Sequence, residues 1–139
     1  IFGNFGQSNY GAAKTGMLGL MNVLAKEGAS HNIKVNTLSP AAATRLTNTI
    51  PGRDEDLGTP DPTRAPELIT PAVLFMCTEG APTGKIIHAG GGKFSICAVY
   101  NNEGVDHGVD CSLETLLDDE ENLLDMSKAV EGFFGGGFG

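Results

Sequence analysis

The chain has 139 residues, of which 40% are hydrophobic, and its formal net charge is −8 at pH 7. The length fits one ordinary domain, and the hydrophobic content is enough for a core, which excludes a wholly disordered chain. The negative charge argues against nucleic acid as a partner, because phosphates are bound by Lys and Arg, and the apolar stretches are too short to span a bilayer.

The first predicted element is a helix over residues 8–28. Ser8 or Asn9 suits its N-cap, and Gly28 suits the left-handed position just past its end. Apolar residues occupy nearly every face of this helix, so we expect it to be buried on two sides. Glycines inside it indicate the close approach of another backbone or a ligand. They are Gly11, Gly16 and Gly19.

The middle of the chain has the helix–strand alternation of an α/β fold. A short buried strand is predicted over residues 33–38, followed by a long proline-rich loop over 39–66. A second helix over 66–78 and a strand over 85–89 continue the pattern. The glycine run 90–92 follows this strand without a clear helix after it, so we interpret it as a turn and not as a phosphate-binding loop.

The last part of the chain differs in charge from the rest. Residues 94–100 form a possible strand, and residues 113–130 form one or two acidic helices. Ten of the 17 acidic residues but one of the nine basic residues lie in 103–139, so the body of the chain is nearly neutral. The final segment, 133–139, contains only Phe and Gly and has no predicted structure.

Tyr10 and Lys14 form the candidate catalytic pair. Their spacing of four residues places both side chains on one face of the first helix. A free phenol ionises only near pH ~10, and a neighbouring ammonium favours the phenolate, so the phenol can exchange a proton with a carbonyl or alcohol oxygen. Without further support, the alternative is an exposed Tyr beside a solvated Lys.

Three segments supply that support: GQSNYGAAKTG at 6–16, VNTLSP at 35–40 and TGKIIHAGG at 83–91. In type, order and spacing they resemble the short-chain dehydrogenase/reductase family, in which a Tyr-x-x-x-Lys helix precedes a strand ending in Asn-x-x-x-Pro. The resemblance covers residues 1 to about 95. It implies an α/β fold, the C-terminal half of a Rossmann-type doubly wound parallel sheet, followed by an acidic helical extension.

The resemblance also implies how the chain is organised. Residues 1–95 would be the C-terminal part of the Rossmann domain, 96–132 a C-terminal extension and 133–139 a Phe/Gly tail. The family's catalytic Ser and its glycine-rich phosphate loop have no counterpart here. They are expected upstream of Ile1, which would leave this chain inactive on its own.

By the same resemblance, Tyr10 is the general acid/base and Lys14 favours its phenolate and binds the nicotinamide ribose. The cofactor is NAD or NADP, and the nicotinamide would lie along the segment after the second motif. Ala41 stands where the family often has Gly, whereas the family's Thr is kept as Thr44. The residues expected to bind the cofactor are Tyr10, Lys14, Pro40, Ala41, Ala43 and Thr44.

A narrower resemblance is to the (3R)-hydroxyacyl-CoA dehydrogenase units of peroxisomal D-bifunctional proteins and their bacterial relatives. It rests on the GNFGQ segment at 3–7 and on residues 66–77. It implies oxidation of 3-hydroxyacyl-CoA to 3-oxoacyl-CoA. The alternatives are a 3-oxoacyl carrier-protein reductase, a hydroxysteroid dehydrogenase, or a non-catalytic truncated chain. The family usually dimerises through the first helix, so a homodimer or homotetramer is expected, in the cytoplasm or, in a eukaryote, the peroxisome.

No metal site is expected from the sequence. The cysteines lack C-x-x-C spacing, and the histidines have no visible partner cluster, so we interpret them as packing or surface residues. These residues are Cys77, Cys97, Cys111, His31, His88 and His107.

Overall fold

The computed structural model describes residues 1–43 and 61–132. The chain divides into two compact units, Ile1–Cys97 and Ala98–Gly139. The first unit carries the residues singled out above and is an α/β structure. The second unit consists of short elements without a parallel sheet in its described part.

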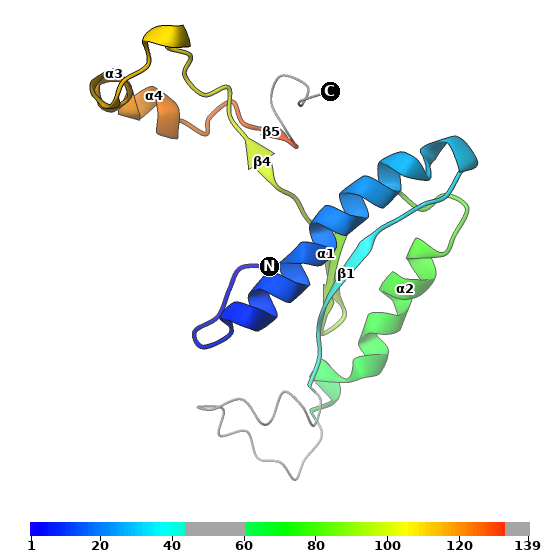
Figure 1. The fold of residues 1–139 in the computed structure, drawn as a ribbon. Coiled ribbons are helices and arrows are strands. Elements are labelled where there is room, and N and C mark those ends of the chain that lie inside the picture. Colours follow the sequence, from blue (N-terminus) through cyan, green and yellow to red (C-terminus); the bar gives the residue numbers. More distant parts are fainter. Residues whose placement is uncertain (44–60, 133–139) are drawn as a thin grey trace. The chain divides into compact units, whose positions relative to one another are not determined.

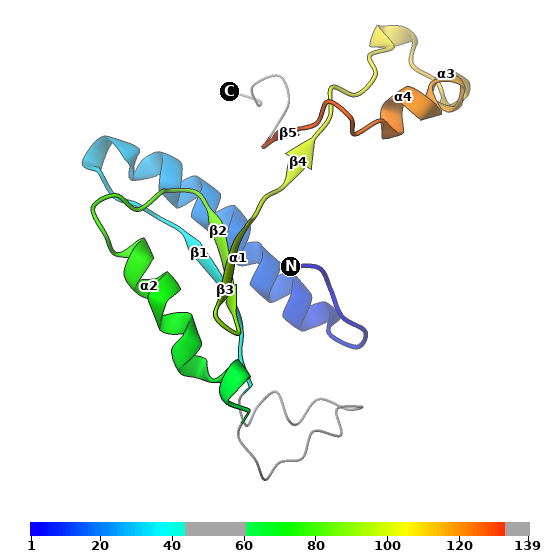
Figure 2. The same ribbon diagram turned by 180° about the vertical axis from the view of Figure 1, so that it is seen from behind.

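The first unit is built on a three-stranded sheet in the order β1-β2-β3. Strand β1 (Thr37–Ala41) pairs in parallel with β2 (Ile86–Gly90), and β2 pairs antiparallel with β3 (Lys93–Cys97). Helix α2 (Thr70–Met76) forms part of the crossover between the two parallel strands. Helix α1 (Ser8–Glu27) and α2 lie on opposite sides of the sheet (Figure 1 and Figure 2).

Two apolar clusters, one on each face of the sheet, hold the helices in place. Because successive side chains in a strand point to opposite faces, neighbouring residues of β2 serve different helices. Ile86 packs with Leu18 and Met21 of α1. Ile87 and Ala89 pack with Ile69 and Ala72 on the α2 side. The core of this unit is therefore two thin layers that share one strand.

Helix α1 forms where the sequence predicts it, but its ends and its burial differ from expectation. It begins at Ser8 with Gln7 as N-cap and without a side-chain capping bond. Only Leu18 and Met21 are buried in this helix, so it packs on one side and not two. Gly28 is right-handed, with φ −77°. An added Cβ there would lie 2.9 Å from the Ile33 Cβ, so this glycine serves close packing.

Strand β1 starts at Thr37, four residues later than predicted. The preceding residues are bound to the turn before β2 by both backbone and side-chain hydrogen bonds, among them the Gly84 N–H donating to the Val35 carbonyl at 2.7 Å. The Val35 N–H donates to Thr83 Oγ1 at 3.0 Å. Asn36 Nδ2 donates to the Pro82 carbonyl at 2.7 Å, and the Lys85 N–H donates to Asn36 Oδ1 at 3.1 Å. The apolar pattern therefore predicts an extended segment at the right place, but it does not predict which residues pair with β2.

The glycine run after β2 is the predicted turn. Gly91 and Gly92 have φ of 56° and 73° and connect the paired residues Gly90 and Lys93. Two consecutive positive φ values give the two-residue hairpin turn that fits the twist of antiparallel strands. The hairpin reverses the chain and adds β3 to the sheet directly after β2, with no helix between the two strands.

The remaining boundaries also shift. A 3-10 turn at Pro66–Ile69 precedes α2, so the predicted helix over 66–78 is α-helical only over Thr70–Met76. The predicted strand over 94–100 ends at Cys97, and Tyr100 belongs to the second unit.

The second unit joins a small antiparallel pair to two short helices. Strand β4 (Tyr100–Asn101) pairs with β5 (Val130–Glu131), and α3 (Leu113–Asp118) and α4 (Glu120–Leu124) lie between them in sequence. Ser112 and Thr115 form a reciprocal capping box that starts α3. Asn102 Nδ2 donates to the Leu123 and Asp125 carbonyls at the end of α4, at 2.8 and 2.9 Å.

Candidate active site

Tyr10 and Lys14 lie together on the exposed surface of the first turns of α1. Lys14 Nζ stands over the Tyr10 ring, 5.6 Å from its centroid. An ammonium over an aromatic face is attracted by the ring, which keeps the two side chains together. Tyr10 is 57% exposed, and among the described residues no hydrogen bond is made by its hydroxyl. The pair is therefore accessible to a ligand.

The segment Pro40–Ala43 comprises the last two residues of β1 and the two residues that follow the strand. In open parallel sheets, ligands bind beyond the carboxyl ends of the strands. The Ala43 N–H donates to the Arg64 carbonyl at 2.9 Å, which fixes the segment after it leaves the sheet. Pro40 and Ala41 are exposed, and Ala43 is half-buried. Thr44, the remaining predicted cofactor-binding residue, lies outside the described residues.

The structure brings these two groups of residues to the same end of the first unit. Helix α1 leads through a short turn into β1 and runs antiparallel to it. In both ribbon views the start of α1 and the end of β1 lie at the lower end of this unit (Figure 1 and Figure 2). The predicted catalytic pair and the predicted cofactor segment therefore share one end of the fold, although 26 or more residues separate them in sequence.

Close packing fixes the end of β1 against β2. Ala41 is paired with Gly90, and a Cβ added at Gly90 would lie 2.9 Å from both the Cβ and the carbonyl oxygen of Ala41. A real Cβ contact is never that short, so a glycine is needed at this position. The glycine lets the Pro40–Ala43 segment lie tightly against the next strand.

The short turn Pro62–Arg64 supplies the carbonyl to which the Ala43 N–H donates. Asp61 caps the turn Pro62–Arg64, and its Oδ1 accepts from the Thr63 hydroxyl at 2.6 Å and from the Thr63 N–H at 2.9 Å. These hydrogen bonds hold the pKa of the exposed Asp61 carboxyl below its usual value. The ionised carboxylate accepts both bonds, so the cap is complete at neutral pH and is lost only in strong acid.

Sequence reasoning missed one polar contact beside this segment. Ser39 Oγ lies 3.4 Å from His88 Nδ1 across the β1–β2 pair, and both side chains are partly buried. The sequence alone predicts His88 to be a packing or surface residue. The two residues are 49 apart in sequence, so only the strand register brings them together.

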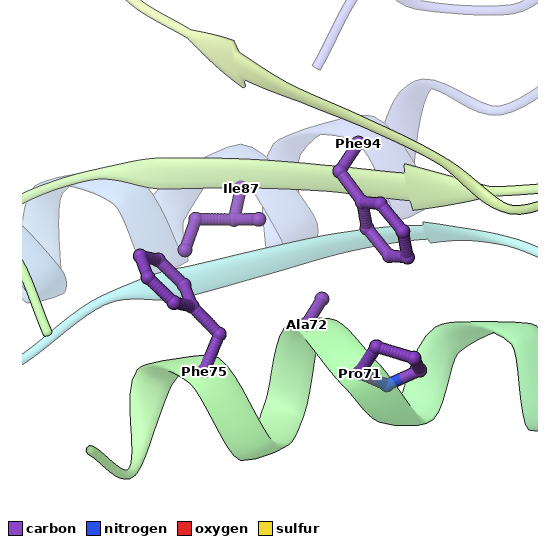
Figure 3. A pocket seen from close by; sticks show the side chains of 5 residues that line it. All are labelled: Pro71, Ala72, Phe75, Ile87 and Phe94. Carbon is purple, nitrogen blue, oxygen red and sulfur yellow. The ribbon is translucent and has the colours of Figure 1, made fainter.

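The first unit also has an apolar hollow that does not belong to the candidate site. It has a volume of about 140 Å³ and lies between α2 and the sheet (Figure 3). Its lining residues are Pro71, Ala72, Phe75, Ile87 and Phe94. Because Ile87 faces α2, the hollow lies on the opposite face of the sheet from α1 and Tyr10.

In residues 1–43 and 61–132, no group of three or more His, Cys, Asp or Glu side chains is placed to hold a metal ion. No described helix has the length and apolar character needed to cross a membrane.

Comparison with known proteins decides the family. A family model described as short chain dehydrogenase matches residues 1–55. The chain is 41% identical over 137 residues to a short-chain type dehydrogenase/reductase of Mycobacterium tuberculosis, across 96% of this chain and 46% of that protein. The chain belongs to the short-chain dehydrogenase/reductase family. The predicted family and α/β fold, with its parallel strand pair, are thereby confirmed.

Two further proteins similar to this chain are peroxisomal multifunctional enzymes. Peroxisomal multifunctional enzyme type 2 of Mus musculus is 45% identical over 93 residues, which are 66% of this chain and 12% of that protein. The full-length type 2 enzyme of Drosophila melanogaster matches in structure with a TM-score of 0.73 at 31% identity, over 98% of this chain and 24% of that one. The chain thus spans less than half the length of each of these relatives.

The residues present fit the nicotinamide end of the cofactor that the short-chain dehydrogenase/reductase family uses. Lys14 offers an exposed ammonium and Tyr10 an exposed hydroxyl, which can bond to ribose hydroxyls. The Pro40–Ala43 segment presents small side chains and backbone beyond the end of a parallel strand. A ring can therefore approach this backbone closely.

Proposed function

We propose that this chain carries the proton-transfer residues of an NAD(P)-dependent oxidoreductase that oxidises 3-hydroxyacyl-CoA to 3-oxoacyl-CoA. The observation that carries the proposal is the Tyr10–Lys14 pair, with Lys14 Nζ 5.6 Å from the ring centroid, at the ligand-binding end of an α/β unit. The peroxisomal multifunctional relatives support the choice of acyl-CoA.

Tyr10 moves the proton. Its hydroxyl, as phenolate, accepts the proton of the substrate alcohol, and as phenol it returns a proton to the carbonyl in the reverse direction. Lys14 holds its positive charge over the Tyr10 ring and binds the ribose. Pro40, Ala41, Ala43 and Thr44 would hold the nicotinamide, which when bound supplies the hydride acceptor. The protein thus supplies orientation and proton transfer.

Three alternatives compete with this assignment. A 3-oxoacyl carrier-protein reductase or a hydroxysteroid dehydrogenase would use the same Tyr10–Lys14 pair on a different carbonyl. A non-catalytic chain built on part of the fold would bind no cofactor. The proposed cofactor is NAD or NADP, and the proposed compartment is the cytoplasm or, in a eukaryote, the peroxisome.

A substrate panel tests the proposal. The full-length gene product is assayed with 3-hydroxyacyl-CoA, a 3-oxoacyl carrier-protein thioester and a hydroxysteroid, each with NAD(H) and NADP(H), by absorbance at the nicotinamide band. We expect the highest kcat/KM for 3-hydroxyacyl-CoA. A preference for the carrier protein or the steroid would replace the substrate assignment, and no turnover together with no cofactor binding would favour the non-catalytic chain.

We also propose that the full-length protein is a homodimer or homotetramer that associates through α1. Beyond the buried Leu18 and Met21, this helix exposes apolar side chains on its outer side. Among them are Met17, Leu20, Val23 and Leu24, which are 39–55% exposed. A second copy of α1 would remove this area from water.

A further inference from the structure

A partly buried polar contact joins the two parallel strands next to the candidate cofactor segment. Ser39 and His88 are register partners in β1 and β2, and Ser39 Oγ lies 3.4 Å from His88 Nδ1. A hydroxyl can donate to a ring nitrogen or accept from it, so the contact is available whichever tautomer His88 adopts. It is the side-chain link between β1 and β2 in the described part of these strands.

The contact lies on the α1 face of the sheet. His88 is two residues after Ile86, and alternate residues of a strand share a face, so His88 is on the side of Ile86, Leu18 and Met21. That is the side from which α1 presents Tyr10 and Lys14. The contact is thus on the same side of the sheet as the proposed proton-transfer residues.

The contact also comes directly before the segment that would line the nicotinamide. Ser39 precedes Pro40 and Ala41, and His88 is two residues before Gly90, against which Ala41 packs. Beyond Ala41 the segment is held by the Ala43 N–H bond to the Arg64 carbonyl. The Ser39–His88 contact and this bond therefore fix the segment at its two ends.

We propose that Ser39 and His88 are a positioning pair that sets the place of the Pro40–Ala43 segment for cofactor binding. The proposal rests on the proposed function of that segment. Neither side chain is assigned to the chemistry. Their hydrogen bond holds the end of β1 against β2. The small residues that follow Ser39 would therefore contact the nicotinamide from a fixed position.

The sheet offers a matched control. Ser95 of β3 is the other register partner of His88, so a serine flanks His88 on each side. Among the described residues no hydrogen bond of the Ser95 hydroxyl is present, and Ser95 is exposed. Ser39→Ala and Ser95→Ala are therefore the same chemical change on the two strands beside His88. Only Ser39→Ala removes a contact with His88.

The experiment compares steady-state kinetics of the full-length gene product and its variants. We expect Ser39→Ala and His88→Leu each to raise the cofactor KM about three- to tenfold with kcat little changed, the effect of losing one hydrogen bond. The double variant should be no worse than the worse single variant, because both remove one contact. Ser39→Thr and His88→Asn, which keep a polar atom at the contact, should stay near wild type.

Each outcome decides between the claims. A cofactor KM that is unchanged in Ser39→Ala, or that rises equally in Ser95→Ala, would overturn the positioning pair while leaving the proposed function intact. A fall in kcat at constant KM would show loss of folded protein only, and would also overturn it. Absence of cofactor-dependent turnover and of NADH binding in the wild-type protein would instead overturn the proposed function, and the pair's role with it.

Discussion

Lys14 should act through its charge. In the full-length gene product, Lys14→Met keeps the length of the side chain but removes the ammonium that lies over the Tyr10 ring and that we propose binds the ribose. We expect kcat/KM to fall by about 10²-fold or more, the usual size of an acid–base contribution. Lys14→Arg should lose less.

Lys26 provides the control for this substitution, because it lies in the last turn of the same helix, away from Tyr10. Lys26→Met should leave the kinetics unchanged. If Lys14→Met turns substrate over as fast as Lys26→Met, then Lys14 has no part in the proton transfer.

Gly90 should tolerate no side chain. In Gly90→Ala the new Cβ would meet Ala41 at 2.9 Å, so the end of β1 has to move. We expect a loss of about 1–3 kcal/mol in the free energy of unfolding, as for other overpacked sites, measured by urea denaturation. Gly80→Ala, where nothing lies within 4 Å of the added Cβ, should be neutral. Equal stabilities of the two variants would show that β1 and β2 do not pack this closely.

The amide side chain of Asn36 makes two hydrogen bonds to the turn before β2, beside the backbone bonds of the same region. Asn36→Ala removes the bond to the Pro82 carbonyl and the bond from the Lys85 N–H, and leaves those part-buried groups without that partner. We expect the free energy of unfolding to fall by about 1–3 kcal/mol in urea denaturation, the cost of an unsatisfied polar group. Asn22→Ala, the same change on the exposed surface of α1, should not destabilise. An equal loss of stability in Asn36→Ala and Asn22→Ala would show that the two hydrogen bonds of Asn36 do not stabilise the fold.

These side-chain bonds explain how far the sequence predicts the elements. Helix α1 was predicted within one residue because a long apolar run with a following glycine is a strong local signal. Strand β1 begins later than the sequence predicts. Val35 bonds to the turn before β2 through its backbone and Asn36 through its side chain, and a hydrophobic pattern contains neither contact. The positive φ predicted for Gly28 occurs instead at Asn32, with φ 55°, since Gly28 serves packing against Ile33.

The candidate site divides in the same way. Tyr10 and Lys14 are visible in the sequence because a spacing of four is a helical neighbour relation. Ser39 and His88 are not, because a separation of 49 residues becomes a contact only through the register of two parallel strands. The site contacts that depend on the sheet therefore needed the structure.

The exposed side of α1 bears on the assembly of the whole protein. Leu20→Glu places a charge in the apolar surface that we propose as the contact between copies, and burying that charge without a partner is costly. We expect the full-length variant to be monomeric, or to need about tenfold higher protein concentration to associate, in light scattering. Asn22→Glu adds the same charge to an exposed polar position and should associate as wild type. A wild-type protein that is monomeric at micromolar concentration would contradict the interface.

The distribution of charge gives the two units different roles. The first unit carries the candidate site, and its sequence holds eight basic and seven acidic residues, so its net charge does not repel the phosphates of a cofactor. The second unit holds ten acidic residues and one basic residue, and its pocket near α4 is lined mainly by polar residues, among them Glu103, Asp119 and Asp125. The negative charge of the chain therefore comes from the second unit and not from the unit that carries the candidate site.

The central claim is that the Tyr10 hydroxyl transfers the proton. The most direct test is kcat of Tyr10→Phe in the full-length gene product, measured with 3-hydroxyacyl-CoA and the preferred cofactor, with NADH binding as the control for an intact site. We predict that kcat falls by about 10²- to 10⁴-fold while NADH still binds, since Phe keeps the ring beneath Lys14 but lacks the proton-transfer atom. A Tyr10→Phe variant that turns substrate over at the wild-type rate would contradict the account.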